Sequence, residues 1–139
     1  MHKRTQIRDR LESVLTGLTT TRGNVFASRL ANLPSTNIPA IKLYLMNEEA
    51  TEEMAFDYDG IVSCEIKIEC YVKTNATFDS TLDTILEEVQ AAITADKNVG
   101  LRDLVKSIHY QSLEVEYEDG DQDLGKQTIT YIAEYEQTL

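Results

Sequence analysis

The side chains that could do chemistry begin with a run of acids late in the chain. The stretch EYEDGDQDLGK, residues 116–126, places aspartates at three alternate positions, Asp119, Asp121 and Asp123. An EF-hand calcium loop begins with this spacing, but it also needs glycine at position 6, a ligand at position 12 and flanking helices. Counted from Asp119, these positions hold Leu124 and Thr130. We therefore predict an acidic hairpin turn that holds no stoichiometric metal. Weak divalent binding by the clustered carboxylates stays open.

Residues that could support catalysis are sparse. The chain has two cysteines and two histidines, and it contains no HExxH, P-loop, GxGxxG or CxxC motif. A nucleophile built from His109 and either Cys64 or Cys70 would need an inward-facing thiol to reach a cleft. Four outward carboxylates could pair as acid and base, but exposed strand faces carry such residues routinely: Glu65, Glu69, Glu114 and Glu116. We expect no enzyme activity, no catalytic residues and no cofactor.

The two cysteines also bear on the compartment. They lie six residues apart in SCEIKIECYV, which has strand periodicity, so about 3.3 Å per residue separates them by roughly 20 Å. A disulfide needs Cα atoms within about 7 Å, so we expect two buried, unpaired thiols. No apolar run approaches the roughly 20 residues that span a bilayer, and no apolar segment of a signal peptide follows the basic start. We expect a cytosolic protein without a membrane partner.

Charge is unevenly distributed along the 139 residues, whose net charge is −11. Residues 1–46 hold seven Lys or Arg and two acids, whereas residues 47–139 hold six bases and 22 acids. An acidic chain is a poor candidate for nonspecific nucleic-acid binding, which relies on cations at phosphates, and we expect no sequence-specific binding either. The asymmetry would let the basic part of one copy face the acidic part of another.

Hydrophobic periodicity places the elements that must position these residues. A 3.6-residue period predicts helices over 5–18 and 80–93 and a short third helix over 98–108, and alternation predicts strands over 24–29, 40–46, 61–73, 112–118 and 128–136. An acidic connector of 14 residues, 47–60, joins two of the strands. We predict one α+β domain over residues 1–139: a mostly antiparallel sheet of about five strands, with two to three helices packed on one face.

Several of these stretches together resemble a known family. They are IRDRLESVLTGL, NVFASRLANLPSTNIPAIKLYLMNEEA, CEIKIECYV, LDTILEEVQAAI and the closing ITYIAEYE. Across nearly its full length the chain resembles the tail terminator proteins of long-tailed bacteriophages, the lambda-like minor tail protein U group.

The resemblance implies a non-enzymatic assembly protein of a phage or prophage. Such a protein is expected to form a homo-hexameric ring on the last ring of the tail tube, to stop tube polymerisation and to present a surface to head-completion proteins. Its partners would be other copies of itself, the tail tube protein and the head-completion proteins. It would be found in the virion tail, and in the host cytoplasm during assembly.

Candidate interface residues come from the charge asymmetry. In a ring, arginines of the first helix could meet acids of a neighbour; the candidates are Arg8, Arg10, Glu48, Glu49, Glu52, Glu53, Glu118, Asp119, Asp121 and Asp123. Three other functions stay open: a neck or head-completion protein, a small-ligand-binding α+β domain, and a small enzyme. A ring would favour the phage assembly roles, and a deep apolar pocket with convergent polar groups would favour the last two.

Overall fold

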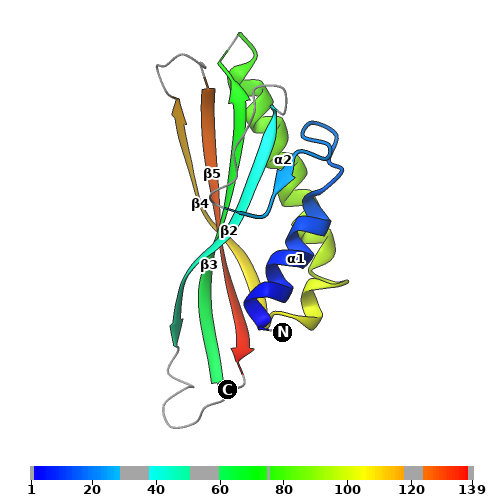
Figure 1. The fold of residues 1–139 in the computed structure, drawn as a ribbon, viewed down its shortest axis with the longest axis vertical. Coiled ribbons are helices and arrows are strands. Elements are labelled where there is room, and N and C mark those ends of the chain that lie inside the picture. Colours follow the sequence, from blue (N-terminus) through cyan, green and yellow to red (C-terminus); the bar gives the residue numbers. More distant parts are fainter. Residues whose placement is uncertain (1, 29–37, 51–59, 75, 118–123, 138–139) are drawn as a thin grey trace.

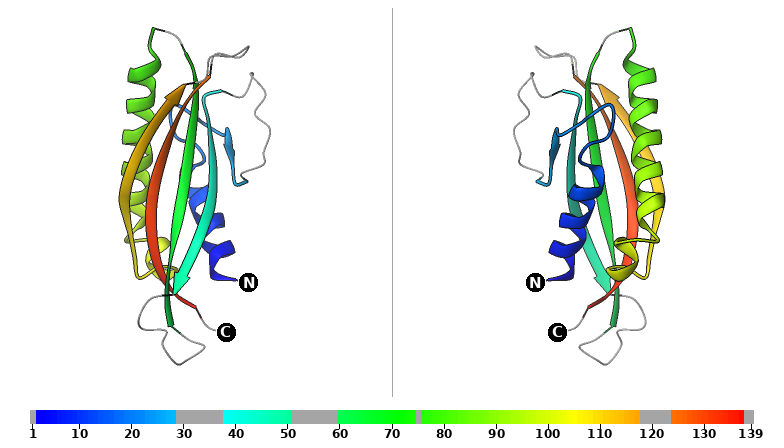
Figure 2. Two further views of the ribbon diagram at one scale, coloured as in Figure 1. Left: turned by 90° about the vertical axis from the view of Figure 1, so that its left-hand side faces the viewer. Right: turned by 90° about the vertical axis from the view of Figure 1, so that its right-hand side faces the viewer.

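A computed structural model describes residues 2–28, 38–50, 60–74, 76–117 and 124–137 (Figure 1). Its elements follow the chain in this order: α1 (Lys3–Leu15), β1 (Val25–Phe26), β2 (Ala40–Ala50), β3 (Gly60–Lys73), α2 (Phe78–Asp96), the 3₁₀ turn η3 (Leu101–Asp103), β4 (Ser107–Tyr117) and β5 (Leu124–Gln137). The strands form one sheet in the order β1-β2-β3-β5-β4. Both α-helices lie on the same face of that sheet (Figure 2). The predicted α+β class is confirmed.

Three of the four strand pairings are antiparallel. β3 lies at the centre between β2 and β5, and its pairing with β5 is continuous from Gly60↔Gln137 to Lys73↔Leu124. β5 pairs with β4 on the side away from β3, so β4 forms one edge of the sheet. β1 instead runs parallel to β2, so the sheet is mixed rather than purely antiparallel.

Alternating side chains bury one face of the sheet against the helices. In β3 the inward positions are all buried: Val62, Cys64, Ile66, Ile68, Cys70 and Val72. Because successive strand residues point to opposite faces, the other face presents the polar side chains of the same strand. Both cysteines are free and buried, as the periodicity predicted.

The two helices supply the cover. α1 buries Ile7, Leu11 and Leu15, which share one side of a 3.6-residue helix. It ends before Gly17, whose φ of 95° is a left-handed conformation that glycine adopts without steric strain. α2 buries a longer stripe, Leu82, Ile85, Val89 and Ile93.

The largest differences from the predicted elements lie before β4 and after β2. The expected third helix over 98–108 is only the single turn η3, because the backbone N–H of Lys106 donates to the carbonyl of Glu134 and Ser107 begins β4. Pairing with β5 therefore replaces the predicted helix, because forming the first turn of a short helix is unfavourable in free energy. The connector expected over 47–60 is shorter than predicted, because β2 continues to Ala50 after a register shift between Leu45 and Glu48.

Candidate functional site

Arg10, a predicted interface residue, forms an ion pair within the chain. Its Nε and Nη2 donate to the two carboxylate oxygens of Asp96 at 2.8 and 2.5 Å, which joins α1 to the last residue of α2. Asp96 is 7% exposed and also accepts a hydrogen bond from the backbone N–H of Leu101 at 3.2 Å. The hydrogen bond from Arg10 holds the pKa of Asp96 below its usual value. The pair therefore fixes the turn that leads into η3.

Gly100 makes room for this pair. A Cβ at Gly100 would lie 2.3 Å from Nε of Arg10, closer than real Cβ atoms approach a heavy atom. The guanidinium of Arg10 therefore lies directly against the backbone of Gly100, in the turn between α2 and η3.

The other described candidates lie on the first helix and at the end of β2. Arg8 is half-buried on α1, whereas Glu48 and Glu49 are exposed in the last residues of β2. The Tyr135 hydroxyl donates to the carboxylate of Glu48, and burial together with this bond raises the pKa of Tyr135. Six predicted interface residues lie outside the described residues: Glu52, Glu53, Glu118, Asp119, Asp121 and Asp123.

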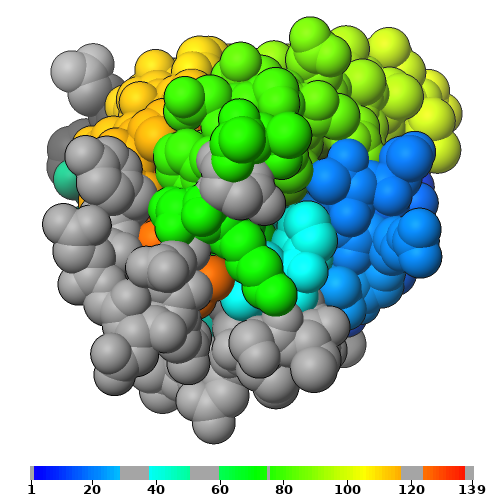
Figure 3. Space-filling model, turned by 90° about the horizontal axis from the view of Figure 1, so that it is seen from above, coloured from blue at the N-terminus to red at the C-terminus, as the bar shows by residue number. Residues whose placement is uncertain are grey.

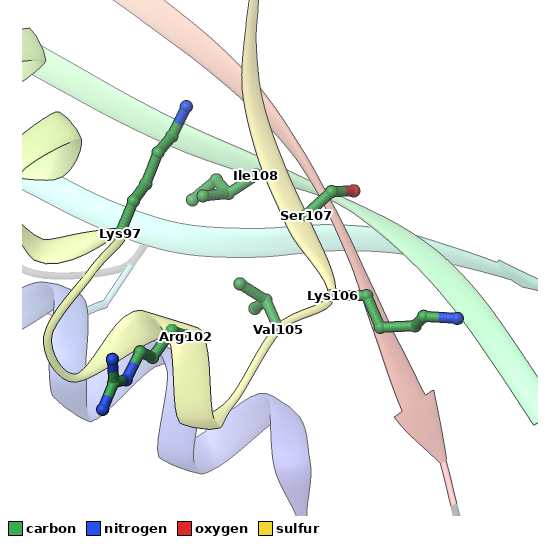
Figure 4. Close-up of a pocket in the computed structure, with 6 residues that line it drawn as sticks. All are labelled: Lys97, Arg102, Val105, Lys106, Ser107 and Ile108. Carbon is green, nitrogen blue, oxygen red and sulfur yellow. The ribbon is translucent and has the colours of Figure 1, made fainter.

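Sequence reasoning missed a basic corner, which we define as the surface around the end of α2, η3 and the start of β4. A hollow of about 270 Å³ lies there, and its lining residues are Lys97, Arg102, Val105, Lys106, Ser107 and Ile108. Val105 and Ile108 point into the hollow beside the stem of Lys97, while the charged ends of Arg102 and Lys106 point outward from its rim (Figure 4). The corner is thus apolar inside and cationic at its edge.

A second hollow of about 240 Å³ adjoins the first. It shares Arg102, Val105 and Lys106 with it and adds Lys3, Asp103, Leu104 and Glu136. Together the two hollows are lined by four cations and two carboxylates, in a chain whose net charge is −11. The other three cations are 94 to 103 residues from Lys3 in the sequence, so only the fold brings the four together.

The edge strand β4 exposes apolar side chains on the same side as the helices. Tyr110 and Val115 pair with Tyr131 and Gln127, whose side chains face the helices, and yet they are 43% and 52% exposed. The end of β4 lies at the surface beside the start of α2 (Figure 3). α2 packs mainly over β3 and β5, so it leaves this side of the outermost strand uncovered.

The opposite face of the sheet holds a partly buried carboxylate. Glu69 accepts hydrogen bonds from the hydroxyls of Tyr44 and Tyr71, each at 2.8 Å, and its Oε2 lies 3.5 Å from Nζ of Lys126. Burial alone would raise the pKa of Glu69, but these three donors outweigh it and lower the pKa. The carboxylate is held as a structural anion that joins β2, β3 and β5.

The groups considered for catalysis do not assemble. Burial raises the pKa of Cys64 to about 11 and that of Cys70 to about 12, which disfavours the reactive thiolate, and His109 is exposed on β4. Glu65 pairs with Lys67 at 3.5 Å rather than with another carboxylate. Within the described ranges, no group of three His, Cys, Asp or Glu side chains gathers as a metal site. No described helix is long and apolar enough to cross a membrane.

Comparison with known proteins identifies a family. The family model for phage minor tail protein U matches residues 2–135, which is nearly the whole chain. No curated protein sequence matches it.

Proposed function

The chain belongs to the phage minor tail protein U family and has a structural role in a phage tail, and we propose that it acts there as the tail terminator. In this role it forms a homo-hexameric ring on the end of the tail tube, stops tube polymerisation and provides the surface that joins the head. The family match over residues 2–135 is the observation that carries the proposal.

The chemistry of the described surface supports a protein-binding role over catalysis or small-ligand binding. The described hollows have volumes of about 180 to 270 Å³, below the roughly 300–1,000 Å³ of typical ligand pockets. The two thiols are buried with raised pKa values, and the partly buried carboxylate of Glu69 is saturated by its donors. A non-enzymatic function without a cofactor is the simplest one consistent with these groups.

Ring closure is supported by the presence of unlike surfaces on one molecule. A closed ring needs a heterologous contact, in which one patch of each subunit meets a different patch of the next. The basic corner provides a cationic patch, whereas the chain as a whole carries 24 acids against 13 bases. Arg8, Glu48, Glu49 and the acids of residues 52–53 and 118–123 remain candidates for the ring interface, where the acids of 118–123 add repulsion between neighbouring subunits.

The proposal also defines partners and location. The tail tube protein contacts one side of the ring and the head-completion proteins contact the other, while the neighbouring subunits are copies of this chain. Assembly takes place in the host cytoplasm, and the finished ring stays in the virion tail. Neither a membrane nor a specific nucleic-acid sequence is a partner.

Native mass spectrometry and negative-stain electron microscopy test this proposal. We expect a monomer that converts to closed six-membered rings as the protein concentration rises. Monomers at every concentration and ionic strength, with no rings on tail tubes, would refute it. Rings that bind isolated heads but not bare tube ends would instead indicate a neck or head-completion protein.

A further inference from the structure

We propose that the basic corner is the acceptor half of the subunit interface and receives an acidic surface of a second copy of this chain. This inference rests on the proposed ring. It adds which described residues make the contact and why the contact closes rings rather than pairs.

The local charge gives the first reason. Lys97, Arg102 and Lys106 surround the hollow, and no described carboxylate forms an ion pair with Lys97 or Lys106. Asp103 lies 3.8 Å from Arg102, but both groups are exposed, so solvent leaves that pair weak. The corner keeps a net positive charge while the rest of the subunit is strongly negative. Unlike charges across an interface speed encounter and fix its register.

The shape and polarity of the corner give the second reason. Its floor is Val105 and Ile108, and an exposed valine, Val99, lies on the turn before η3 with 60% of its surface accessible. Tyr110, two residues beyond Ile108 on β4, is 43% exposed. Apolar side chains ringed by charge are the usual anatomy of a protein contact, with a dry centre and a polar rim. A free anion such as phosphate would leave these apolar groups in water.

The corner is also held in place before any partner arrives. The ion pair between Arg10 and Asp96 ties α1 to the end of α2, and the N–H of Leu101 donates to the same carboxylate. Asp96 is therefore already neutralised and does not compete for Lys97 or Lys106. A preorganised surface binds with less loss of conformational freedom.

The sign of the charge decides the symmetry. Two copies that met corner to corner would set cations against cations, which disfavours a two-fold dimer. The corner must instead face a different, acidic part of the next subunit. In a linear oligomer built by such a heterologous contact, one end subunit has a free basic corner and the other end has a free acidic surface. Both surfaces are covered only when a ring closes.

A charge-reversal pair tests the inference. Lys97→Glu with Lys106→Glu alters the corner, and Arg22→Glu with Lys73→Glu alters exposed cations elsewhere and changes the net charge equally. We expect the corner variant to need at least about 10-fold more protein for half-maximal ring formation, because like charges placed across an interface repel. The control variant should stay within about 3-fold of the parent. Circular dichroism and melting temperature check that both variants fold.

A mixing experiment tests the asymmetry. The corner variant keeps its acidic surface, so it should join the parent on one side only and stop rings from closing when the two are mixed. Rings can also be formed from a mixture of ¹⁵N-labelled and ¹⁴N parent protein and treated with a carbodiimide, which couples a lysine to a nearby carboxylate. We expect Lys97 or Lys106 of a subunit with one label to be coupled to a carboxylate of a subunit with the other label.

The outcomes separate the inference from the proposed function. Normal rings from the corner variant, or couplings of these lysines only within one isotope, would overturn the inference and leave the ring intact. A parent that forms no rings would overturn both. If the corner variant forms normal rings but no longer retains a short duplex DNA that the parent retains, the corner is a phosphate-binding surface and the inference is wrong.

Discussion

At the residue scale, one ion pair determines how the end of α2 is built. Asp96 lies at the last position of the helix, where a negative charge is unfavourable because the helix dipole is itself negative there. Arg10 offsets this with two short hydrogen bonds from α1. The pair thus neutralises an unfavourable charge at the end of α2 and links α2 to α1.

Asp96→Asn should lower the free energy of unfolding by about 1–2 kcal/mol, because it replaces charge-assisted hydrogen bonds by neutral ones. The free energy of unfolding of this variant should also depend less on pH in the acid range than that of the parent. The folded pKa of Asp96 is depressed, so its stabilisation is present above the unfolded value of about 3.9 and is lost as pH falls through the folded pKa. Urea denaturation between pH 7 and pH 2 measures both effects. A variant with the acid dependence of the parent would contradict this role.

Gly100→Ala should weaken the same pair from the backbone side. The added Cβ would lie 2.3 Å from Nε of Arg10, so the guanidinium must move away from Asp96. We expect destabilisation similar to that of Asp96→Asn, and little further loss when the two changes are combined, because they break one interaction. Gly23→Ala is the control, since nothing lies within 4 Å of its added Cβ. Additive losses in the double variant would show that Gly100 acts elsewhere.

At the element scale, the network around Glu69 holds three strands together across the face that the helices leave open. Tyr44→Phe removes one hydroxyl donor to this carboxylate and should lower the free energy of unfolding by about 1–3 kcal/mol. The pKa of Glu69 should rise, because burial then meets less compensation. Carbon NMR of the Glu69 carboxyl group measures the pKa, and chemical denaturation measures the stability.

Tyr110→Phe is the matched control for Tyr44→Phe. Tyr110 is 43% exposed and packs edge-on against Tyr131 with ring centroids 6.0 Å apart, a contact that phenylalanine retains. It should change stability by no more than about 0.5 kcal/mol. Equal effects from the two variants would mean that the hydroxyl of Tyr44 does not stabilise the sheet through Glu69.

The elements also show where sequence reasoning succeeds. Strict alternation in β3 and the 3.6-residue stripe of α2 were sufficient to predict those elements, because each buries one continuous face. Alternation in β4 predicted the strand, but periodicity does not reveal that this strand lies at the edge of the sheet, where Val115 is exposed. The segment before β4 has helical spacing, but strand pairing with β5 overrides it.

At the scale of the whole molecule, the basic corner could not be predicted. Its cations come from the start of α1 and from residues 97–106, and their proximity depends on how α1 crosses the end of α2. The sequence indicated only that charges of opposite sign were separated along the chain. Arg10 was predicted as an interface residue, but it pairs within the chain with Asp96, which lies 86 residues away in the sequence and could not be identified as its partner from periodicity or charge.

The net charge predicts how assembly responds to salt. Subunits of charge −11 repel one another over a Debye length that falls from about 30 Å at 0.01 M salt to about 8 Å at 0.15 M. Ion pairs that are partly buried in an interface are screened much less. Raising the ionic strength over this range, or adding a divalent cation, should therefore promote ring formation.

Changing Asp119, Asp121 and Asp123 together to Asn should lower the salt concentration needed for ring formation. Light scattering measures both, and rings that dissolve as salt rises would show that attraction between subunits dominates instead.

The length of tail tubes tests the terminator function most directly. Tubes are polymerised from the tail tube protein of the same phage without a terminator, and the protein is then added during growth. We predict that tube length stops increasing, that each stopped tube carries a ring at one end, and that Lys97→Glu with Lys106→Glu leaves tubes growing. Tubes that continue to lengthen at protein concentrations where rings are abundant would contradict the proposed function.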